Sequence, residues 1–204
     1  MHEPITLYTQ AERLEYRDGP GEDPGVLAWD LQGLYGGDYN RFVWKTEGES
    51  ADGDTAFELQ LLYGRAWTAF FDLQFGIRYA ETDGGDVTAA VAGVQGLLPY
   101  LVETDVALFL SEDGDVTGRA EFEKDFLLTE RWVLQPRAEF DVALQDVPGL
   151  GIDSGLTKLA LGLRLRYEIT RKLAPYVGVD WKRHDSAGGE DTDTYALAGL
   201  RFWF

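Results

Sequence analysis

The sequence predicts an all-β fold, an antiparallel up-and-down transmembrane β-barrel of about twelve strands, with ten or fourteen as the alternatives. Two observations support this prediction. Apolar residues recur at every second position in one segment after another, and the connections between these segments alternate between short and long. A transmembrane strand needs only about 9–11 residues and turns every second side chain toward lipid, so a barrel needs no long apolar run. Because no linker or low-complexity stretch divides the chain, residues 1–204 are expected to form one domain.

Twelve segments carry the two-residue period of a strand. They are residues 11–17, 26–35, 40–47, 55–66, 69–80, 87–97, 100–111, 115–127, 131–144, 157–169, 174–184 and 194–204. In 69–80, Phe71, Phe75 and Ile77 alternate with polar residues and glycine. The same alternation recurs in 131–144, and 157–169 is the clearest case, with leucines at every second position from Leu159 to Leu165. A one-residue slip would move charged groups into lipid, so this pattern also fixes the register.

The last segment, 194–204, resembles the C-terminal strand of bacterial outer-membrane barrels. Counted back from Phe204, alternate residues are apolar, and the intervening set includes Arg201 and Tyr195. In such barrels the terminal phenylalanine is part of the signal that the barrel assembly machinery reads. The resemblance therefore implies this machinery as a partner, with outer-membrane lipid around the barrel.

The connections show a second regularity. Short ones fall near residues 36–39, 67–68, 98–99, 129–130 and 170–172, and long or acidic ones at 18–25, 48–54, 81–86, 112–115, 145–155 and 185–193. An outer-membrane barrel with both termini in the periplasm has short periplasmic turns and longer outer loops. Much of the net charge of −18 is then expected at the outer rim. Such a rim is either the ordinary surface of an acidic protein or a negative mouth that concentrates cations by its field.

Charged residues also fall on the predicted lumen face. Neighbouring segments 100–111 and 115–127 bring Glu103, Asp105, Glu121 and Glu123 together, and Glu139 and Asp141 follow on 131–144. The counter-charge is expected from Arg137, Arg164 and Arg166 in lumen salt bridges. One interpretation is a salt-bridged plug, because unpaired buried charge is costly. The other is a hydrated path in which excess carboxylates select cations.

Composition argues against several functions. The net charge of −18 disfavours nucleic-acid binding, because phosphate contacts need a basic surface. No GxSxG pattern occurs, and His184 is the only histidine beyond His2. An outer-membrane hydrolase is therefore the least favoured alternative, and we expect no enzyme.

Several ordered motifs resemble the copper resistance protein B family of bacterial outer-membrane proteins. They are ERLEYR at 12–17, WDLQGLYGGDYNR at 29–41, WKTEGE at 44–49, GVQGLLPY at 93–100, SEDGD at 111–115, LQPR at 134–137, LGLRLRYE at 161–168, APYVGV at 174–179 and RFWF at 201–204. The resemblance spans nearly the whole chain. It implies a barrel that handles copper ions, together with periplasmic copper-handling proteins as partners.

The chain departs from the family in its soft ligands. Family members carry a Met- and His-rich segment ahead of the barrel, and we expect this chain to lack it, since Met1 is its only methionine. Thioethers suit Cu(I) and imidazole suits Cu(II), so His184 is the one imidazole ligand available near the barrel, unless it is an ordinary loop histidine. Carboxylates remain as weak ligands for a transit site.

The sequence thus predicts a monomeric outer-membrane protein that binds copper as its cargo and passes it through an acidic lumen. The candidate metal-contacting residues are Glu103, Asp105, Glu121, Glu123, Glu139, Asp141 and His184. The main alternative is a plugged barrel that anchors a copper-sequestering N-terminal segment without conducting ions.

Overall fold

The computed structural model describes residues 5–19, 25–52, 54–82, 85–147, 153–186 and 189–204 of the chain. In this part of the chain all regular structure is β. The strands are β1 (Thr6–Asp18), β2 (Val26–Gly36), β3 (Asn40–Ala51), β4 (Asp54–Ala66), β5 (Phe71–Thr82), β6 (Gly85–Leu98), β7 (Val102–Ser111), β8 (Val116–Glu123), β9 (Phe126–Leu127), β10 (Trp132–Ala143), β11 (Gly155–Tyr167), β12 (Leu173–Ser186) and β13 (Gly189–Trp203). Within the same residues, no helix is long and apolar enough to cross a membrane.

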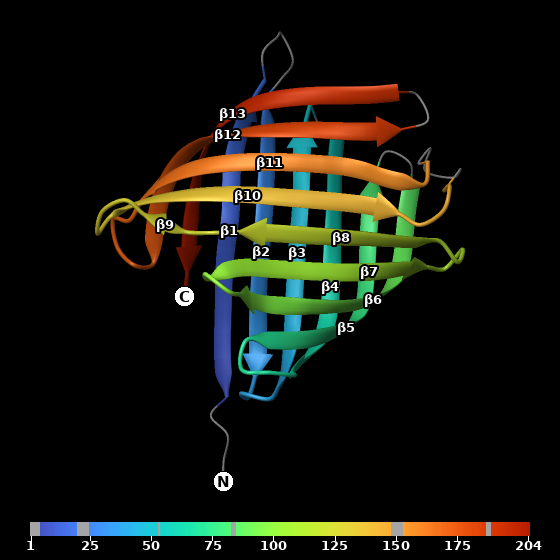
Figure 1. The fold of residues 1–204 in the computed structure, drawn as a ribbon, viewed down its shortest axis with the longest axis horizontal. Helices are drawn as coiled ribbons and strands as arrows, with labels where there is room; N and C mark the ends of the chain where they lie inside the picture. Colours follow the sequence, from blue (N-terminus) through green and yellow to red (C-terminus); the bar gives the residue numbers. More distant parts are fainter. Residues whose placement is uncertain (1–4, 20–24, 53, 83–84, 148–152, 187–188) are drawn as a thin grey trace.

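The strands form one closed antiparallel barrel. Each strand pairs with its neighbour in sequence, except that β8 and β9 both pair with β10, and β13 pairs with β1 to close the sheet. The backbone of Phe204 exchanges two hydrogen bonds of 3.0 Å with Thr9, so closure extends to the last residue. In Figure 1 the strands of one wall, such as β8 and β10–β12, cross steeply over β1–β4 of the other wall. The predicted up-and-down topology is confirmed.

The eighth predicted strand is interrupted. Residues 115–127 form β8 and the short β9, separated at Lys124 and Asp125, so the described residues make twelve barrel strands from thirteen segments. Asp125 turns inward, where its carboxylate pairs with Arg166 (2.5 Å) and Arg201 (3.9 Å). The prediction of one regular strand over 115–127 was therefore wrong. The break at Lys124 and Asp125 lets the carboxylate of Asp125 reach two lumen arginines.

Several predicted long connections are mostly strand. The β3–β4 ladder continues to the pair Ala51 and Asp54, β5–β6 to Thr82 and Gly85, and β12–β13 to Ser186 and Gly189. Asp52, next to the first of these pairs, and Gly85 and Gly189, within the other two, adopt positive φ, as tight hairpins require. The acidic segments therefore extend the barrel wall instead of forming long loops, and the predicted connections 18–25 and 145–155 lie partly outside the described residues.

The two faces of the wall have opposite character. Outward side chains such as Ile77 and Val177 are each 57% exposed, whereas Arg164 and Glu15 in the lumen are 2% and 1% exposed. This inside-out distribution is what a barrel in lipid requires, since lipid takes the place of an apolar core on the outside. The apolar cluster that the structure does contain, which includes Val43, Leu62 and Phe109, lines one side of the lumen.

Gly76 on β5 allows the close approach of β4. A Cβ atom at Gly76 would lie 2.0 Å from the carbonyl oxygen of Leu61, whereas a Cβ at Gly64 would meet only side-chain atoms, at 3.1 and 3.2 Å, as its nearest neighbours. We expect Gly76→Ala to lower the free energy of unfolding by about 1–3 kcal/mol, because backbone must move. Gly64→Ala should cost clearly less. Urea unfolding followed by tryptophan fluorescence checks this, and equal losses in the two variants would contradict it.

Candidate functional site

The predicted acidic residues of β7 and β8 are directly opposite one another. The register pairs Glu103 with Glu123 and Asp105 with Glu121, and the next strand pairs Glu121 with Glu139. The sequence-based expectation that these residues lie together therefore agrees with the geometry. Like charges at directly opposite positions are destabilising, so this acidic ladder, defined as Glu103, Asp105, Glu121, Glu123 and Glu139, needs cations from elsewhere in the lumen.

Arg137 on β10 supplies the first of these cations. Its guanidinium donates to Glu121 (2.7 Å) and Glu139 (2.6 Å) and lies 3.2 Å from Glu123. A planar guanidinium can serve several carboxylates at once, which explains an arginine at this position. This is the one predicted counter-charge that pairs with the acidic ladder.

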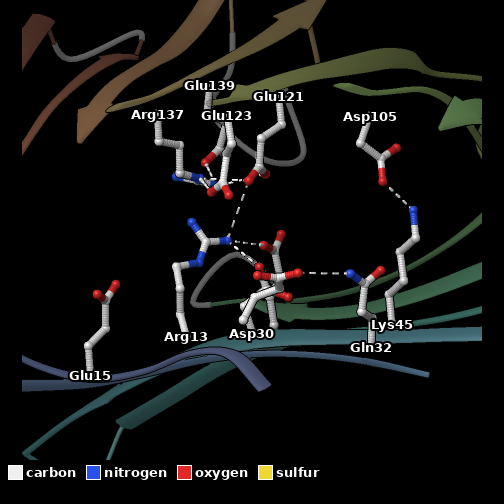
Figure 2. A network of polar contacts seen from close by, with 12 residues as sticks. Arg13, Glu15, Asp30, Gln32, Lys45, Asp105, Glu121, Glu123, Arg137 and Glu139 are labelled. Atoms are coloured by element: carbon white, nitrogen blue, oxygen red, sulfur yellow. Dashed lines mark hydrogen bonds and ion pairs between the residues drawn. The ribbon is translucent and has the colours of Figure 1, made fainter. Parts of the chain in front are cut away.

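Further cations reach the acidic ladder from the opposite wall. Figure 2 shows Arg13 and Lys45 extending toward the carboxylates from the side that carries Asp30 and Gln32. Lys45 pairs with Asp105, and Arg13 pairs with Asp30 and approaches Glu121 to 3.9 Å. Ion pairs therefore bridge the lumen as well as the ladder.

The other two predicted arginines pair elsewhere. Arg164 contacts Glu15 (2.8 Å) and Asp180 (3.0 Å), and all three side chains are almost fully buried. Arg166 contacts Asp125 and approaches Glu168 to 3.8 Å. Both are lumen salt bridges as expected, but their carboxylate partners are not those of the acidic ladder.

Asp141 and His184 lie near the last residues of β10 and β12, at the end of the barrel opposite the end where both termini lie. Asp141 accepts a hydrogen bond of 3.0 Å from Arg119. His184 is exposed, and in the β-sheet register it lies opposite Lys158 on β11 and Asp191 on β13. Among the described residues, no group of three or more histidine, cysteine, aspartate and glutamate side chains could hold a metal ion.

Several residues that line the lumen were not predicted from the sequence. Lys45, Glu47 and Glu49 all face inward on β3, but Glu49 had been assigned to a connection. Glu12 faces inward because β1 shifts register between Ala11 and Arg13, so polar residues before and after the bulge share one face. The change in the polar alternation at Glu12 and Arg13 was the available signal.

Three cavities lined by described residues lie in the lumen. The acidic cavity, about 270 Å³, lies toward the termini and is lined by Glu12, Asp30, Glu47, Glu58, Glu103, Asp105, Glu121 and Glu123, with Lys45 and Arg119 as its basic residues. The vestibule, about 670 Å³, lies toward the end opposite the termini, and its lining includes Asp86, Glu112, Asp113 and Asp115. The side cavity, about 320 Å³, includes Arg17, Lys158, Lys182 and His184. A cation that enters through the vestibule therefore meets acidic residues there and again in the acidic cavity.

Two solved structures with the same fold are porins. The NanC porin superposes with a TM-score of 0.60 at 10% identity, and the match covers 97% of this chain and 99% of that one. The KdgM porin gives 0.57 at 12% identity with the same coverage. At such low identity the likeness shows the fold alone, a porin-type β-barrel.

Sequence comparison gives the family. A model described as Copper resistance protein B precursor (CopB) matches residues 5–204. Copper resistance protein B of Escherichia coli is 41% identical over 209 residues, and a Copper resistance protein B homolog of Pseudomonas syringae pv. tomato is 38% identical. Each match covers 98% of this chain and 70% of the relative. The chain is therefore an outer-membrane barrel that belongs to the copper resistance protein B family.

Proposed function

We propose that this protein is a non-enzymatic outer-membrane barrel that binds copper ions in its acidic cavity and passes them through its lumen. The observation that carries the proposal is the lining of the acidic cavity, in which carboxylates far outnumber basic residues. The termini and short turns would face the periplasm, and the acidic hairpins would face outward. Copper is the cargo in this account, and the proposal gives the protein no resident metal.

The chemistry of the lining supports weak binding. Carboxylates are poorer ligands for copper than imidazole or thiolate, and most of those in the acidic cavity are already paired with arginine or lysine. A conducting path requires entry to be favourable and release to be easy. A carboxylate that transiently exchanges its arginine or lysine partner for a copper ion would meet both requirements.

Equilibrium dialysis of the folded barrel in detergent against Cu(II) chloride tests the binding step. We expect saturable, weak binding that is lost on acidification, because protonated carboxylates do not attract cations. Sodium at moderate excess should compete less effectively than a second divalent ion. Copper uptake no greater than that of the heat-unfolded chain would contradict the proposal.

A second function is favoured by the ion pairs that bridge the lumen. Arg13 on β1 approaches Glu121 on β8, and Lys45 on β3 pairs with Asp105 on β7. These contacts suit a closed barrel that anchors a copper-sequestering segment in the membrane. Such a scaffold would give no copper flux even when folded.

The proposal also includes partners. Outer-membrane lipid would surround the apolar exterior of a monomeric barrel, and the assembly machinery would recognise the strand that ends at Phe204. Copper released at the periplasmic end would pass to copper-handling proteins there.

A further inference from the structure

Arg119 connects the two walls of the barrel. It lies on β8, and its guanidinium is 3.0 Å from Asp141 on the adjacent β10. The same guanidinium pairs with Glu47 on β3 and lies 3.5 Å from Glu58 on β4. In the sheet order β5, β6 and β7 separate β4 from β8, so the contacts with Glu47 and Glu58 cross the lumen. One side chain thus joins strands that are not neighbours in the sheet.

The same residue lies where the cavities meet. Among the described residues, Arg119 alone lines the acidic cavity, the vestibule and the side cavity. Phe109 lines both the acidic cavity and the vestibule, and Glu47 and Glu58 line both the acidic cavity and the side cavity. Arg119 contacts each of these three side chains, so it lies in the partition between the cavities.

Arg78 completes this partition. It pairs with Glu58 at 2.6 Å, and its guanidinium carbon lies 4.4 Å from the ring centre of Phe109. The guanidinium carbon of Arg119 lies 6.0 Å from the same ring centre. Stacking of a cation on an aromatic ring adds to the ion pairs that hold the layer. We call Glu47, Glu58, Arg78, Phe109 and Arg119 the Arg119 junction.

We propose that Arg119 is the side chain that closes the lumen and sets its resistance to cations. Its guanidinium acts in two ways: it occupies the space between the cavities, and its fixed positive charge repels a cation leaving the acidic cavity. The side chain is 18% exposed, so it borders open space into which it can turn. Release of Glu47 and Glu58 would free the one side chain that lines all three cavities among the described residues.

The inference deepens the proposed function, because it places the barrier on the path assigned to copper. The closure itself can be measured with potassium, without any copper. We propose to record potassium conductance across planar bilayers for the parent barrel, Arg119→Ala and the charge-balanced double variant Arg119→Gln/Glu47→Gln. The double variant keeps the net charge unchanged, because Glu47 loses its charge together with Arg119, and it keeps the test available if Arg119→Ala does not fold. Heat-modifiable mobility on gels identifies folded protein.

The matched control is Arg41→Gln/Asp72→Asn. This ion pair, 3.3 Å between Arg41 and Asp72, runs along one wall from β3 to β5 and lines none of the three cavities. We expect conductance to rise several-fold in the Arg119 variants and to stay at the parent level in the control. Parent-level conductance in the folded double variant, or an equal rise in the control, would overturn the inference.

Copper flux separates this inference from the proposed function. Arg119 variants that pass potassium but no copper would support the role of Arg119 in closing the lumen and would contradict copper passage. Copper flux in the parent with unchanged potassium conductance in the variants would support copper passage and overturn the junction.

Discussion

Replacing Arg164 with alanine is expected to destabilise the folded barrel by about 3–5 kcal/mol, because it would leave buried carboxylates without their cation. Arg164 is 2% exposed and donates hydrogen bonds to Glu15 (2.8 Å) and Asp180 (3.0 Å). Glu15 would keep Arg17 at 2.7 Å, but Asp180 would keep only a longer contact of 3.6 Å to Arg17. Two negative charges would then share one remaining guanidinium in a site closed to water.

Urea unfolding of the barrel in lipid vesicles measures this loss. Arg131→Ala is the matched control, because Arg131 is exposed and its side chain bonds only to the hydroxyl of Tyr167 among the described contacts. The triple variant Glu15→Gln/Arg164→Met/Asp180→Asn should recover most of the stability, since it removes the unpaired charges. A loss in Arg164→Ala no larger than in Arg131→Ala would show that the buried cluster is not a stability determinant.

Neutralising the acidic ladder at all its positions except Glu139 is expected to weaken copper binding by about tenfold or more. A unit charge at about 4 Å contributes about 1 kcal/mol in water and about 4 kcal/mol at an effective dielectric constant of 20, and about 1.4 kcal/mol corresponds to tenfold. The variant is Glu103→Gln, Asp105→Asn, Glu121→Gln and Glu123→Gln. The fold should persist, because the ion pairs of Arg137 with Glu139 and of Arg13 with Asp30 remain.

The control carries the same change in net charge outside the cavities. Asp38, Asp52, Asp54 and Glu130 are exposed on connections or strand ends and line none of the three cavities, so their four amide variants should bind copper like the parent. Equilibrium dialysis compares the two variants. Equal weakening in both would mean that overall charge, and not the acidic ladder, attracts copper. Parent-level binding in the ladder variant would remove these four residues from the path.

The arrangement of the acidic ladder could be predicted because it depends on neighbouring strands. Period-two alternation places Asp105 and Glu121 on the lumen face, and β7 and β8 are consecutive strands of an up-and-down barrel, so their carboxylates must meet. The adjacency of Arg137 follows in the same way, despite the break at Lys124 and Asp125. Local pattern and connectivity were sufficient for these contacts.

The pairs that cross the lumen could not be predicted from alternation. Whether Arg119 reaches Glu47 and Glu58, or Lys45 reaches Asp105, depends on the barrel diameter and on strand tilt and stagger. These properties belong to the closed sheet and leave no short-range signal. The bulge in β1 at Ala11 and Arg13 has a similar effect, because it brings Glu12 into the lumen against a strict two-residue period.

Copper flux into proteoliposomes that contain the parent barrel tests the central claim most directly. Vesicles with a copper-sensitive dye inside would receive Cu(II) outside, with protein-free vesicles and a sodium gradient as comparisons. The account predicts copper entry that depends on folded protein and saturates with copper concentration. No copper entry through heat-modifiable, correctly inserted barrels would contradict it and would leave the closed anchoring scaffold as the function of this fold.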